Sequence, residues 1–267
     1  MKFKFFALTD VGRVRNNNED AVTFDESHGV AVLADGMGGY NAGEVASGMA
    51  TVFMKSELVR WLSAGAQNAD PAHIGKAIDI CAHKVNQSIL QAAVSNPQYT
   101  GMGTTLVVGV FQADRVTLGH VGDSRCYRFR SGELVQLTKD HSMLQEQVDA
   151  GLLTLEQAAV APGKNLLTRA LGSEEALQLD VNTYPVLAED IYLMCSDGLT
   201  DMLDNADIAH VLKTGATLET TGAELVAQAN AKGGRDNIAV LLTKVLPADV
   251  PAGLMSSLFG RAKHPTK

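Results

Sequence analysis

The sequence predicts an α+β protein in which sheets pack against each other and helices cover the outside. Apolar residues recur at helical spacing in two long segments before residue 100, and the segments between residues 104 and 137 alternate with a period of two. The later strands and helices lack the regular strand–helix–strand alternation of a parallel sheet. This order of elements favours packed antiparallel sheets.

The first third of the chain predicts strands followed by two helices. Residues 1–10 have the pattern of a first strand, and residues 30–34 form a buried-type apolar run that leads into a glycine-rich turn. An amphipathic helix is expected from about residue 43 to residue 62. A second helix has a clear start, because Asp70 can cap it and Pro71 suits its first turn.

Four short β-rich segments in the middle of the chain predict an antiparallel meander. They span residues 104–111, 115–121, 125–130 and 133–137. Ser142 with Gln145 offers a capping-box start for a short helix. From about Thr154 to Asn165 the pattern dissolves into Ala, Pro and Gly, which predicts a mobile flap.

The end of the chain predicts two strands, one helix and a tail. Residues 191–195 and 238–245 are strand-like, and a helix is expected around Leu225. We expect one catalytic domain, residues 1–246, followed by a flexible tail, residues 247–267. An alternative is that the apolar residues of the tail line one side of a short docking helix.

Composition and charge exclude several classes of protein. Apolar residues make up 46% of the chain, but no apolar run approaches the roughly 20 residues that span a bilayer. The net charge of −8 disfavours a nucleic-acid partner, which clustered Lys and Arg would bind. The amino terminus lacks a signal-peptide pattern, and Cys81, Cys126 and Cys195 show no ligand spacing. We therefore expect a cytoplasmic protein without a transmembrane segment, a disulfide framework or a zinc site.

Five aspartates are the most informative residues of the chain. Each follows an apolar β-like run or lies in a tight turn, and they are Asp20, Asp35, Asp123, Asp197 and Asp236. A single Asp-Gly is usually just a turn, because both residues favour turns for conformational reasons. Five such sites can converge if the fold brings strand ends together, and hard carboxylate oxygens gathered in this way suit Mg²⁺ or Mn²⁺. The sequence thus predicts a binuclear metal site.

Arg15 adds a candidate substrate contact. It stands five residues before Asp20, in a segment that also contains Glu19. A guanidinium group has the planar fork that matches phosphate oxygens. An arginine beside metal-binding carboxylates therefore suggests a phosphoryl substrate.

Taken in order, the motifs resemble those of the bacterial metal-dependent serine/threonine protein phosphatases of the type 2C family. They include Asn18-Glu19-Asp20, Asp35-Gly36-Met37-Gly38-Gly39, Gly122-Asp123-Ser124-Arg125, Ser196-Asp197-Gly198 and Asp236-Asn237. The matching motifs run from about residue 5 to residue 245. The resemblance implies a four-layer α-β-β-α sandwich, in which two central antiparallel sheets are flanked by helix pairs.

The resemblance also implies a set of metal ligands. Asp35 would bridge two metal ions, with the Gly36 carbonyl on one ion and Asp197 and Asp236 on the other. A third, weaker ion near the flap would use Asp123 and Asp197. The implied cofactors are Mn²⁺ or Mg²⁺, two per active site, with this third ion in addition.

Other residues would support these ligands. Glu19 and Asp20 would hold metal-bound waters, Arg15 would bind the substrate phosphate, and Asn237 would position Asp236 or a water. The cations would activate a water molecule and offset charge on the transferring phosphoryl group, so that no protein nucleophile is required. The implied catalytic residues are Arg15, Asp35, Asp197 and Asp236.

Two positions depart from the family pattern. Many bacterial relatives have a histidine where this chain has Tyr40, and many eukaryotic members have one where this chain has Met37. The histidine general acid of the family therefore does not transfer to either position. Tyr40 could donate a hydrogen bond to a metal water or to the substrate, or simply pack over the glycine turn. His120 and His141 lie beside motifs, but a histidine in a strand or turn is more often structural, so the leaving-group acid stays open.

The function implied by the resemblance is hydrolysis of phosphoserine and phosphothreonine in proteins, opposing a bacterial Ser/Thr kinase in signalling or secretion control. The partners would be phosphoproteins, including the kinase and its targets, and we expect a monomer. A metal phosphodiesterase or small-molecule phosphatase is a second interpretation, which phosphopeptide hydrolysis would separate from the first. A weak or inactive phosphatase-like binding module is a third, but such a module needs no costly cluster of like charges.

Overall fold

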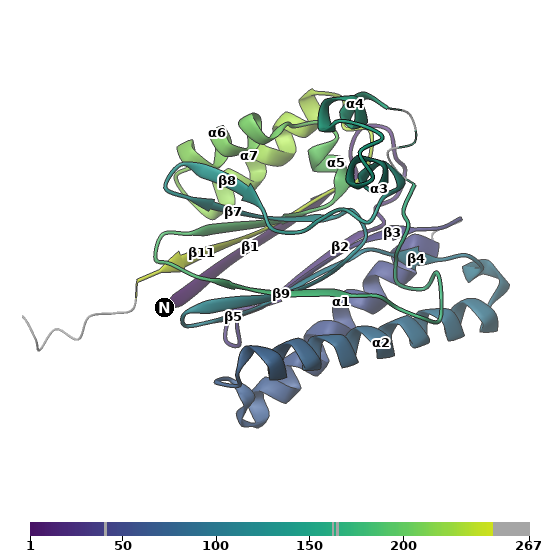
Figure 1. Ribbon diagram of the computed structural model, residues 1–267, viewed down its shortest axis with the longest axis horizontal. Helices are drawn as coiled ribbons and strands as arrows, with labels where there is room; N and C mark the ends of the chain where they lie inside the picture. The colour runs from purple at the N-terminus through teal and green to yellow at the C-terminus, as the bar shows by residue number, and fades with distance from the viewer. Residues whose placement is uncertain (40–41, 162, 164–165, 248–267) are drawn as a thin grey trace, which may run out of the picture.

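The computed structural model describes residues 1–39, 42–161, 163 and 166–247. In this part of the chain, two antiparallel sheets stack face to face, and a layer of helices covers the outer face of each sheet (Figure 1). The predicted four-layer α-β-β-α sandwich is confirmed. Tyr40 and the tail from residue 248 onward lie outside the described residues.

The first sheet has five strands and joins the two ends of the described chain. Its order is β1 (Lys2–Asp10), β11 (Ile238–Leu246), β10 (Ile191–Cys195), β7 (Arg125–Arg130) and β8 (Glu133–Gln136). The first strand pairs with the last along its whole length, from Lys2 opposite Leu246 to Asp10 opposite Ile238. The strands expected at residues 1–10, 191–195 and 238–245 are therefore confirmed.

The second sheet contains the middle strands of the chain. Its order is β2 (Asp20–Asp25), β3 (Val30–Met37), β5 (Leu106–Gln112), β6 (Arg115–Val121) and β9 (Asp180–Pro185), with the short β4 (Gly103–Thr104) paired to β3. The strands β2 and β9 lie at the edges of this order. Neither has the continuous apolar run that marks a strand buried on both faces.

The central strands are apolar on both faces because each face packs against a different layer. In β11, Ile238, Val240 and Leu242 belong to the core beneath α6 (Asn205–Thr214) and α7 (Leu218–Ala231). Ala239 and Leu241 belong instead to the core between the two sheets. A strand that is buried on both faces has an unbroken run of apolar residues, and this run is the pattern from which the strand at residues 238–245 was predicted.

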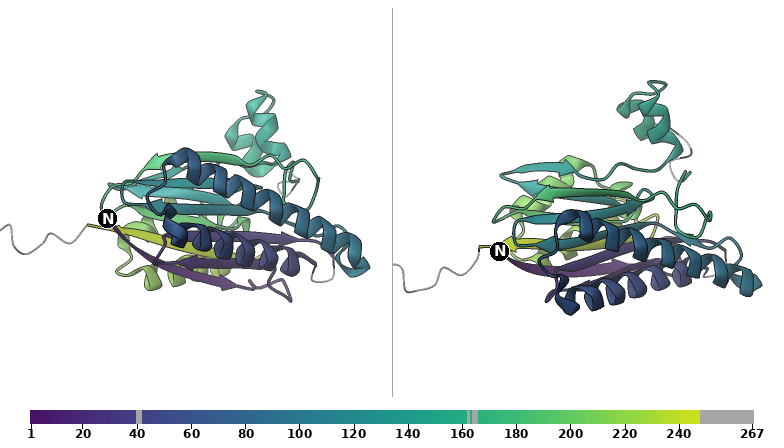
Figure 2. Two further views of the ribbon diagram at one scale, coloured as in Figure 1. Left: turned by 90° about the horizontal axis from the view of Figure 1, so that it is seen from below. Right: turned by 60° about the horizontal axis from the view of Figure 1, so that its bottom comes forward.

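The other helix layer consists of α1 (Ala42–Trp61) and α2 (Pro71–Ser95), which lie side by side on the second sheet (Figure 2). A turn of π-helix, Leu62–Ala66, follows α1, and a 3₁₀ turn, Pro97–Tyr99, follows α2. The Asp70 carboxylate accepts a hydrogen bond from the backbone N–H of His73 at 3.0 Å, so the predicted cap of α2 is confirmed. No helix of the described residues is long and apolar enough to cross a membrane.

The expectation of a single meander is wrong. β5 pairs with β6 in the second sheet, and β7 pairs with β8 in the first, so the chain changes sheets between β6 and β7. Gly122 makes this turn with a φ of +106°, and a Cβ atom there would lie 2.6 Å from the Thr105 side chain. A period-two pattern cannot distinguish a strand that stays in one sheet from a strand that crosses to the other.

The segment expected to be a patternless flap is partly helical. After α3 (Met143–Asp149), which Ser142 caps as predicted, the chain forms α4 (Leu155–Val160). A capping box starts α4, because Thr154 and Gln157 each bond the backbone N–H of the other. Both short helices stand off from the sandwich (Figure 2).

Candidate active site

The ends of strands from both sheets meet at one end of the sandwich, beside α3 and α5 (Asp197–Thr200), and each carries an acidic residue (Figure 1). Asp20 opens β2 and lies directly opposite Asp35 of β3 in the antiparallel register. Asp197 follows β10, Asp236 precedes β11, and Asp123 follows β6. The predicted convergence of strand ends is therefore what the fold provides.

A cleft of about 210 Å³ opens at this end of the sandwich. The residues that line it are Arg15, Glu19, Asp35, Gly36, Met37, Gly38, Thr105, Asp123, Leu167, Asp197, Asp236 and Asn237. Asp20 is buried beside Asp35 and does not line the cleft. Of the residues predicted from the sequence, only Tyr40 falls outside the part of the chain that the structure describes.

Four acidic residues in and beside the cleft, Asp20, Asp35, Asp123 and Asp197, have raised pKa values. Burial is the largest cause at each position, and neighbouring carboxylates add to it. Together they raise the pKa of Asp35 and of Asp197 well above the usual range. Burial raises the pKa of Asp123 to about 6 and that of Asp20 to about 7. Keeping all of these groups ionised at neutral pH therefore requires positive charge in the cleft.

The donor set fits divalent cations. One oxygen of Asp20, Oδ1, is buried without a hydrogen-bond partner, while Oδ2 accepts a hydrogen bond from Ser196 Oγ at 2.7 Å. Buried polar atoms are rarely left unpaired, so the orphaned oxygen points to a missing ion or water. Carboxylate oxygens and backbone carbonyls are the ligands that Mg²⁺ and Mn²⁺ prefer.

Gly36 allows the end of β3 to approach the start of α1 closely. A Cβ atom at Gly36 would lie 2.1 Å from the carbonyl oxygen of Gly43, so no larger residue fits. The Gly36 N–H donates to the Glu19 carbonyl at 3.0 Å. This backbone contact fixes Glu19 and the end of β3 relative to each other.

Arg15 lies at the cleft with its side chain 51% exposed, and its Nη2 donates to Asp236 Oδ2 at 2.7 Å. This hydrogen bond is the main cause that raises the pKa of Arg15 above its ordinary value. A guanidinium has five N–H donors, so pairing with one carboxylate oxygen leaves others for a phosphate. The position therefore suits both a ligand-orienting and a phosphate-binding role.

Asn237 joins the segment that carries Arg15 to the start of β11. Its Oδ1 accepts from the Glu19 N–H at 2.8 Å, and its Nδ2 donates to the carbonyls of Val11 and Asn17 at 3.0 and 2.8 Å. Its backbone N–H donates to Asp236 Oδ1 at 2.8 Å. The side chain thus holds the loop, and the backbone orients Asp236.

Sequence reasoning considered Ser124 as a structural hydroxyl beside the site but missed the hydroxyl groups of Thr105 and Ser196, which hold acidic residues. Thr105 Oγ1 accepts from the Asp35 N–H at 2.9 Å and shares a 2.7 Å hydrogen bond with Ser124 Oγ. Ser196 bonds Asp20, as described above, and accepts from the Ala239 N–H at 2.8 Å. The signal available for Ser196 was its position directly before Asp197.

The cysteines are structural, as expected. Cys81, Cys126 and Cys195 are all free and buried. Burial raises the pKa of Cys195 to about 12 and that of Cys81 to about 11. Thiols of this kind are not nucleophiles at neutral pH.

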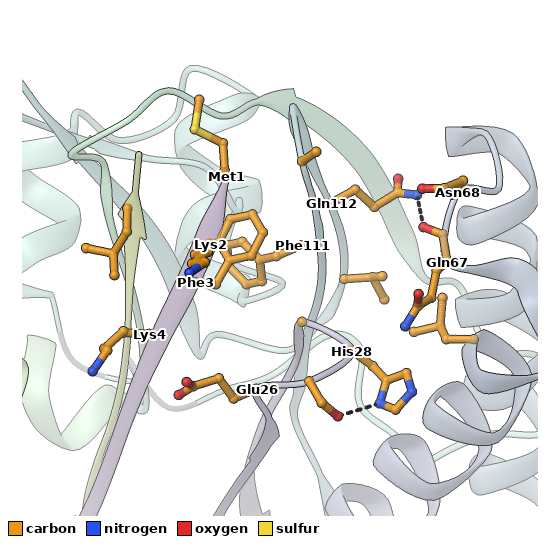
Figure 3. A pocket seen from close by; sticks show the side chains of 16 residues that line it. Met1, Lys2, Phe3, Lys4, Glu26, His28, Gln67, Asn68, Phe111 and Gln112 are labelled. Atoms are coloured by element: carbon orange, nitrogen blue, oxygen red, sulfur yellow. Dashed lines mark hydrogen bonds between the residues drawn. The ribbon is translucent and has the colours of Figure 1, made fainter. Parts of the chain in front are cut away.

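A larger pocket, of about 630 Å³, lies at the opposite ends of the strands. Figure 3 shows the rings of Phe3 and Phe111 side by side within it, and their centroids are 5.5 Å apart. Gln112 Nε2 donates to the Gln67 carbonyl at its rim (Figure 3). None of the acidic residues predicted to bind metal lines this pocket.

The fold and the acidic cleft define a metal-dependent phosphatase of the two-sheet sandwich class, and comparisons with known proteins support this. The chain matches the protein phosphatase 2C family over residues 13–242. It is 38% identical over 243 residues to the serine/threonine phosphatase stp of Listeria innocua, covering 88% of this chain and 93% of that protein.

Comparison with solved structures supports the same family assignment. The S. agalactiae serine/threonine phosphatase superimposes with a TM-score of 0.83 at 38% identity, covering 91% of this chain and 99% of that one. The catalytic domain of the serine/threonine phosphatase PstP, in complex with two manganese ions, gives a TM-score of 0.80 at 34% identity, with 92% and 99% covered. The chain therefore belongs to the protein phosphatase 2C family and is a metal-dependent protein serine/threonine phosphatase.

Proposed function

We propose that the chain removes phosphate from phosphoserine and phosphothreonine in proteins by means of water activated between two divalent cations. The observation that carries the proposal is the cluster of buried carboxylates with raised pKa values next to Arg15. Such a cluster is costly in the absence of cations, because burial and like charges both oppose ionisation.

The ions would be Mn²⁺ or Mg²⁺. Asp35 and the Gly36 carbonyl would hold one ion, and Asp35, Asp197 and Asp236 the other, while Asp123 with Asp197 would hold a third, weaker ion. When bound, the cations make water a better nucleophile and offset the charge of the transferring phosphoryl group. The chain then needs no covalent nucleophile of its own.

The protein side chains would position the reactants. Arg15 would bind two oxygens of the phosphate and direct the phosphorus toward the acidic cluster. Glu19 and Asp20 would accept hydrogen bonds from ordered waters, and Asn237 would keep the Arg15 segment in place. This division of roles rests on orientation and charge rather than on an acid–base residue within the cleft.

The physiological partners would be a Ser/Thr kinase and its targets, with the protein acting as a monomer in signalling or secretion control. Support comes from the similarity to the Listeria and S. agalactiae proteins, which are described as serine/threonine phosphatases. The acidic net charge of −8 gives no support to a nucleic-acid substrate.

Phosphate release from a phosphothreonine peptide, measured with and without Mn²⁺ or Mg²⁺, tests the proposal. We expect release to depend on the added ion and to stop on chelation, because oxygen ligands hold these ions moderately. A phosphodiester serves as the comparison substrate and should be a poor one. Full turnover by metal-stripped protein, or a preference for the diester, would contradict the proposal.

A further inference from the structure

A second group of possible metal ligands lies outside the acidic cleft. It consists of His120 on β6, His141 in the segment between β8 and α3, and Asp180 at the start of β9. One ligand atom from each lies within 4.8 Å of those of the other two. The strand register explains part of this geometry, because His120 and Asp180 are direct partners in the β6–β9 pair. We define these three residues as the histidine cluster.

His120 is the most unusual member of the cluster. It is 2% exposed, and neither of its ring nitrogens has a hydrogen-bond partner. The backbone carbonyls of Gly122 and Ser124 influence its pKa, but they do not reach hydrogen-bonding geometry. A buried imidazole left in this way is costly, and therefore points to a ligand at one of its nitrogens.

Both histidines are in the form that binds metals. Burial lowers the pKa of His120 to about 3, and burial also lowers the pKa of His141. A neutral imidazole has one lone pair, as coordination requires. In His141 this lone pair lies on Nδ1 and accepts from the Gly122 N–H, so coordination through Nε2 requires a change of tautomer. The ring centroids of the two histidines are 4.7 Å apart, so the two rings pack against each other.

Asp180 completes the cluster from the surface side. Its Oδ2 is 3.2 Å from His141 Nε2, and its Oδ1 is 3.4 Å from Arg169 Nη1. Arg169 can therefore stay hydrogen-bonded to Asp180 Oδ1 while Oδ2 binds an ion. The positive charge of Arg169 opposes a cation nearby. The Asp180 side chain is 43% exposed on an edge strand, which provides an entry path and freedom to move inward.

We propose that the histidine cluster is a second metal site, for Zn²⁺ or a similar late transition-metal ion, separate from the carboxylate cluster of the cleft. Two imidazoles and one carboxylate form a ligand set typical of Zn²⁺, with a fourth position left for water. Imidazole nitrogens favour such ions over the hard Mg²⁺. The three ligand atoms, which lie within 4.8 Å of one another, must move closer together to reach metal distances of about 2.0–2.1 Å.

Occupation of this site has a consequence for the cleft. His141 Nδ1 accepts from the Gly122 N–H at 3.2 Å, so the single proton of the neutral ring lies on Nε2, facing Asp180. Coordination through Nε2 would shift that proton to Nδ1, where it would face the Gly122 N–H and break this bond. Gly122 begins the turn to Asp123. Zn²⁺ at the histidine cluster is therefore expected to disturb Asp123 and to inhibit hydrolysis.

Binding can be measured independently of activity. The full chain is titrated with Zn²⁺ against a chromophoric chelator in excess Mg²⁺, which occupies the carboxylate cluster. We expect one equivalent of Zn²⁺ that resists Mg²⁺. His120→Asn and Asp180→Asn should each weaken it by at least about tenfold, since ligand removal costs no less than the loss of a supporting hydrogen bond. His210→Asn, on the exposed face of α6, is the matched control and should bind like the parent chain.

Two further measurements separate this site from the cleft and from misfolding. Asp35→Asn should retain the Mg²⁺-resistant equivalent, and Co²⁺ in place of Zn²⁺ should give visible absorption that changes in His120→Asn. Asp180→Asn should fold like the parent chain, because the Asp180 side chain is half-exposed. A loss of Zn²⁺ binding in this variant therefore reports on the ligand and not on misfolding. The proposal is overturned if no Mg²⁺-resistant Zn²⁺ binds, or if that binding survives in both His120→Asn and Asp180→Asn. It is also overturned if binding is lost in Asp35→Asn alone.

Discussion

Replacing Asn237 with alanine should loosen the segment that carries Arg15 without removing any charged group. Asn237 is 6% exposed and makes three side-chain hydrogen bonds, to the Glu19 N–H and to the carbonyls of Val11 and Asn17. At about 1 kcal/mol each, the three bonds amount to about 3 kcal/mol of unfolding free energy. Water entering the space left by the amide would return part of this, so the loss should be about 2–3 kcal/mol.

The kinetic effect should follow from the position of Arg15. If the loop moves, the guanidinium no longer meets the phosphate at the correct distance, and KM should rise more than kcat falls. The acidic residues on the strands keep their own backbone supports, such as the bond from the Asp35 N–H to Thr105 Oγ1. Metal dependence should therefore change little in this variant.

Urea denaturation and phosphopeptide kinetics measure the two effects separately. Asn182→Ala, at an exposed position of β9, is the matched control and should stay within about 0.5 kcal/mol of the parent chain. If Asn237→Ala unfolds at the same urea concentration as the parent and has the same KM, the three hydrogen bonds do not position the loop and the reasoning is refuted.

Four other perturbations, three substitutions and a change of pH, test the cleft. Arg15→Ala should raise KM, because it removes a charge-assisted phosphate contact of about 1.5–3 kcal/mol; an unchanged KM in steady-state kinetics would make Arg15 structural. Asp35→Asn should abolish turnover at any Mn²⁺ concentration, whereas Asp123→Asn should mainly raise the Mn²⁺ that is needed, and equal metal titrations for both would contradict the division. Metal-free protein should lose stability as pH rises from about 4 to about 7. Burial raises the folded-state pKa of Asp20 to about 7 and of Asp123 to about 6, so the folded chain keeps protons that the unfolded chain releases. Thermal melts at about pH 5 and about pH 8 measure this effect, and higher stability at the higher pH would speak against it.

The sequence predicted the acidic cleft well because of where its aspartates stand. Asp35 lies near the end of β3, and Asp197 directly follows the strand β10 and its Ser196. An apolar run is visible in the sequence, so the residue at its end can be placed at the edge of a sheet before the sheet is known. The family resemblance then supplied the sandwich and the order of the motifs.

Three features of the fold were not predicted, because the residues that determine them carry a weak sequence pattern or none. The edge strand β9 is mostly exposed and lacks apolar alternation. The crossing from one sheet to the other depends on the positive φ of Gly122, which a glycine permits but does not demand. The short helix α4 had a readable signal in Thr154 and Gln157, and the proline- and glycine-rich residues around it obscured that signal.

The cleft combines charges that repel with a neutral frame that holds them together. The β2–β3 register sets Asp20 opposite Asp35, an arrangement that destabilises a sheet when both groups are charged. Uncharged groups hold these residues: Thr105 Oγ1 accepts from the Asp35 N–H, Ser196 Oγ donates to the Asp20 carboxylate, and the Asn237 backbone N–H donates to the Asp236 carboxylate. Apart from Arg15, which pairs with Asp236, these groups are uncharged, so they keep the carboxylates in place without neutralising them. The remaining negative charge is therefore balanced by cations. Because the carboxylates are already held in position, little of the cation-binding free energy is spent on reorganising the protein.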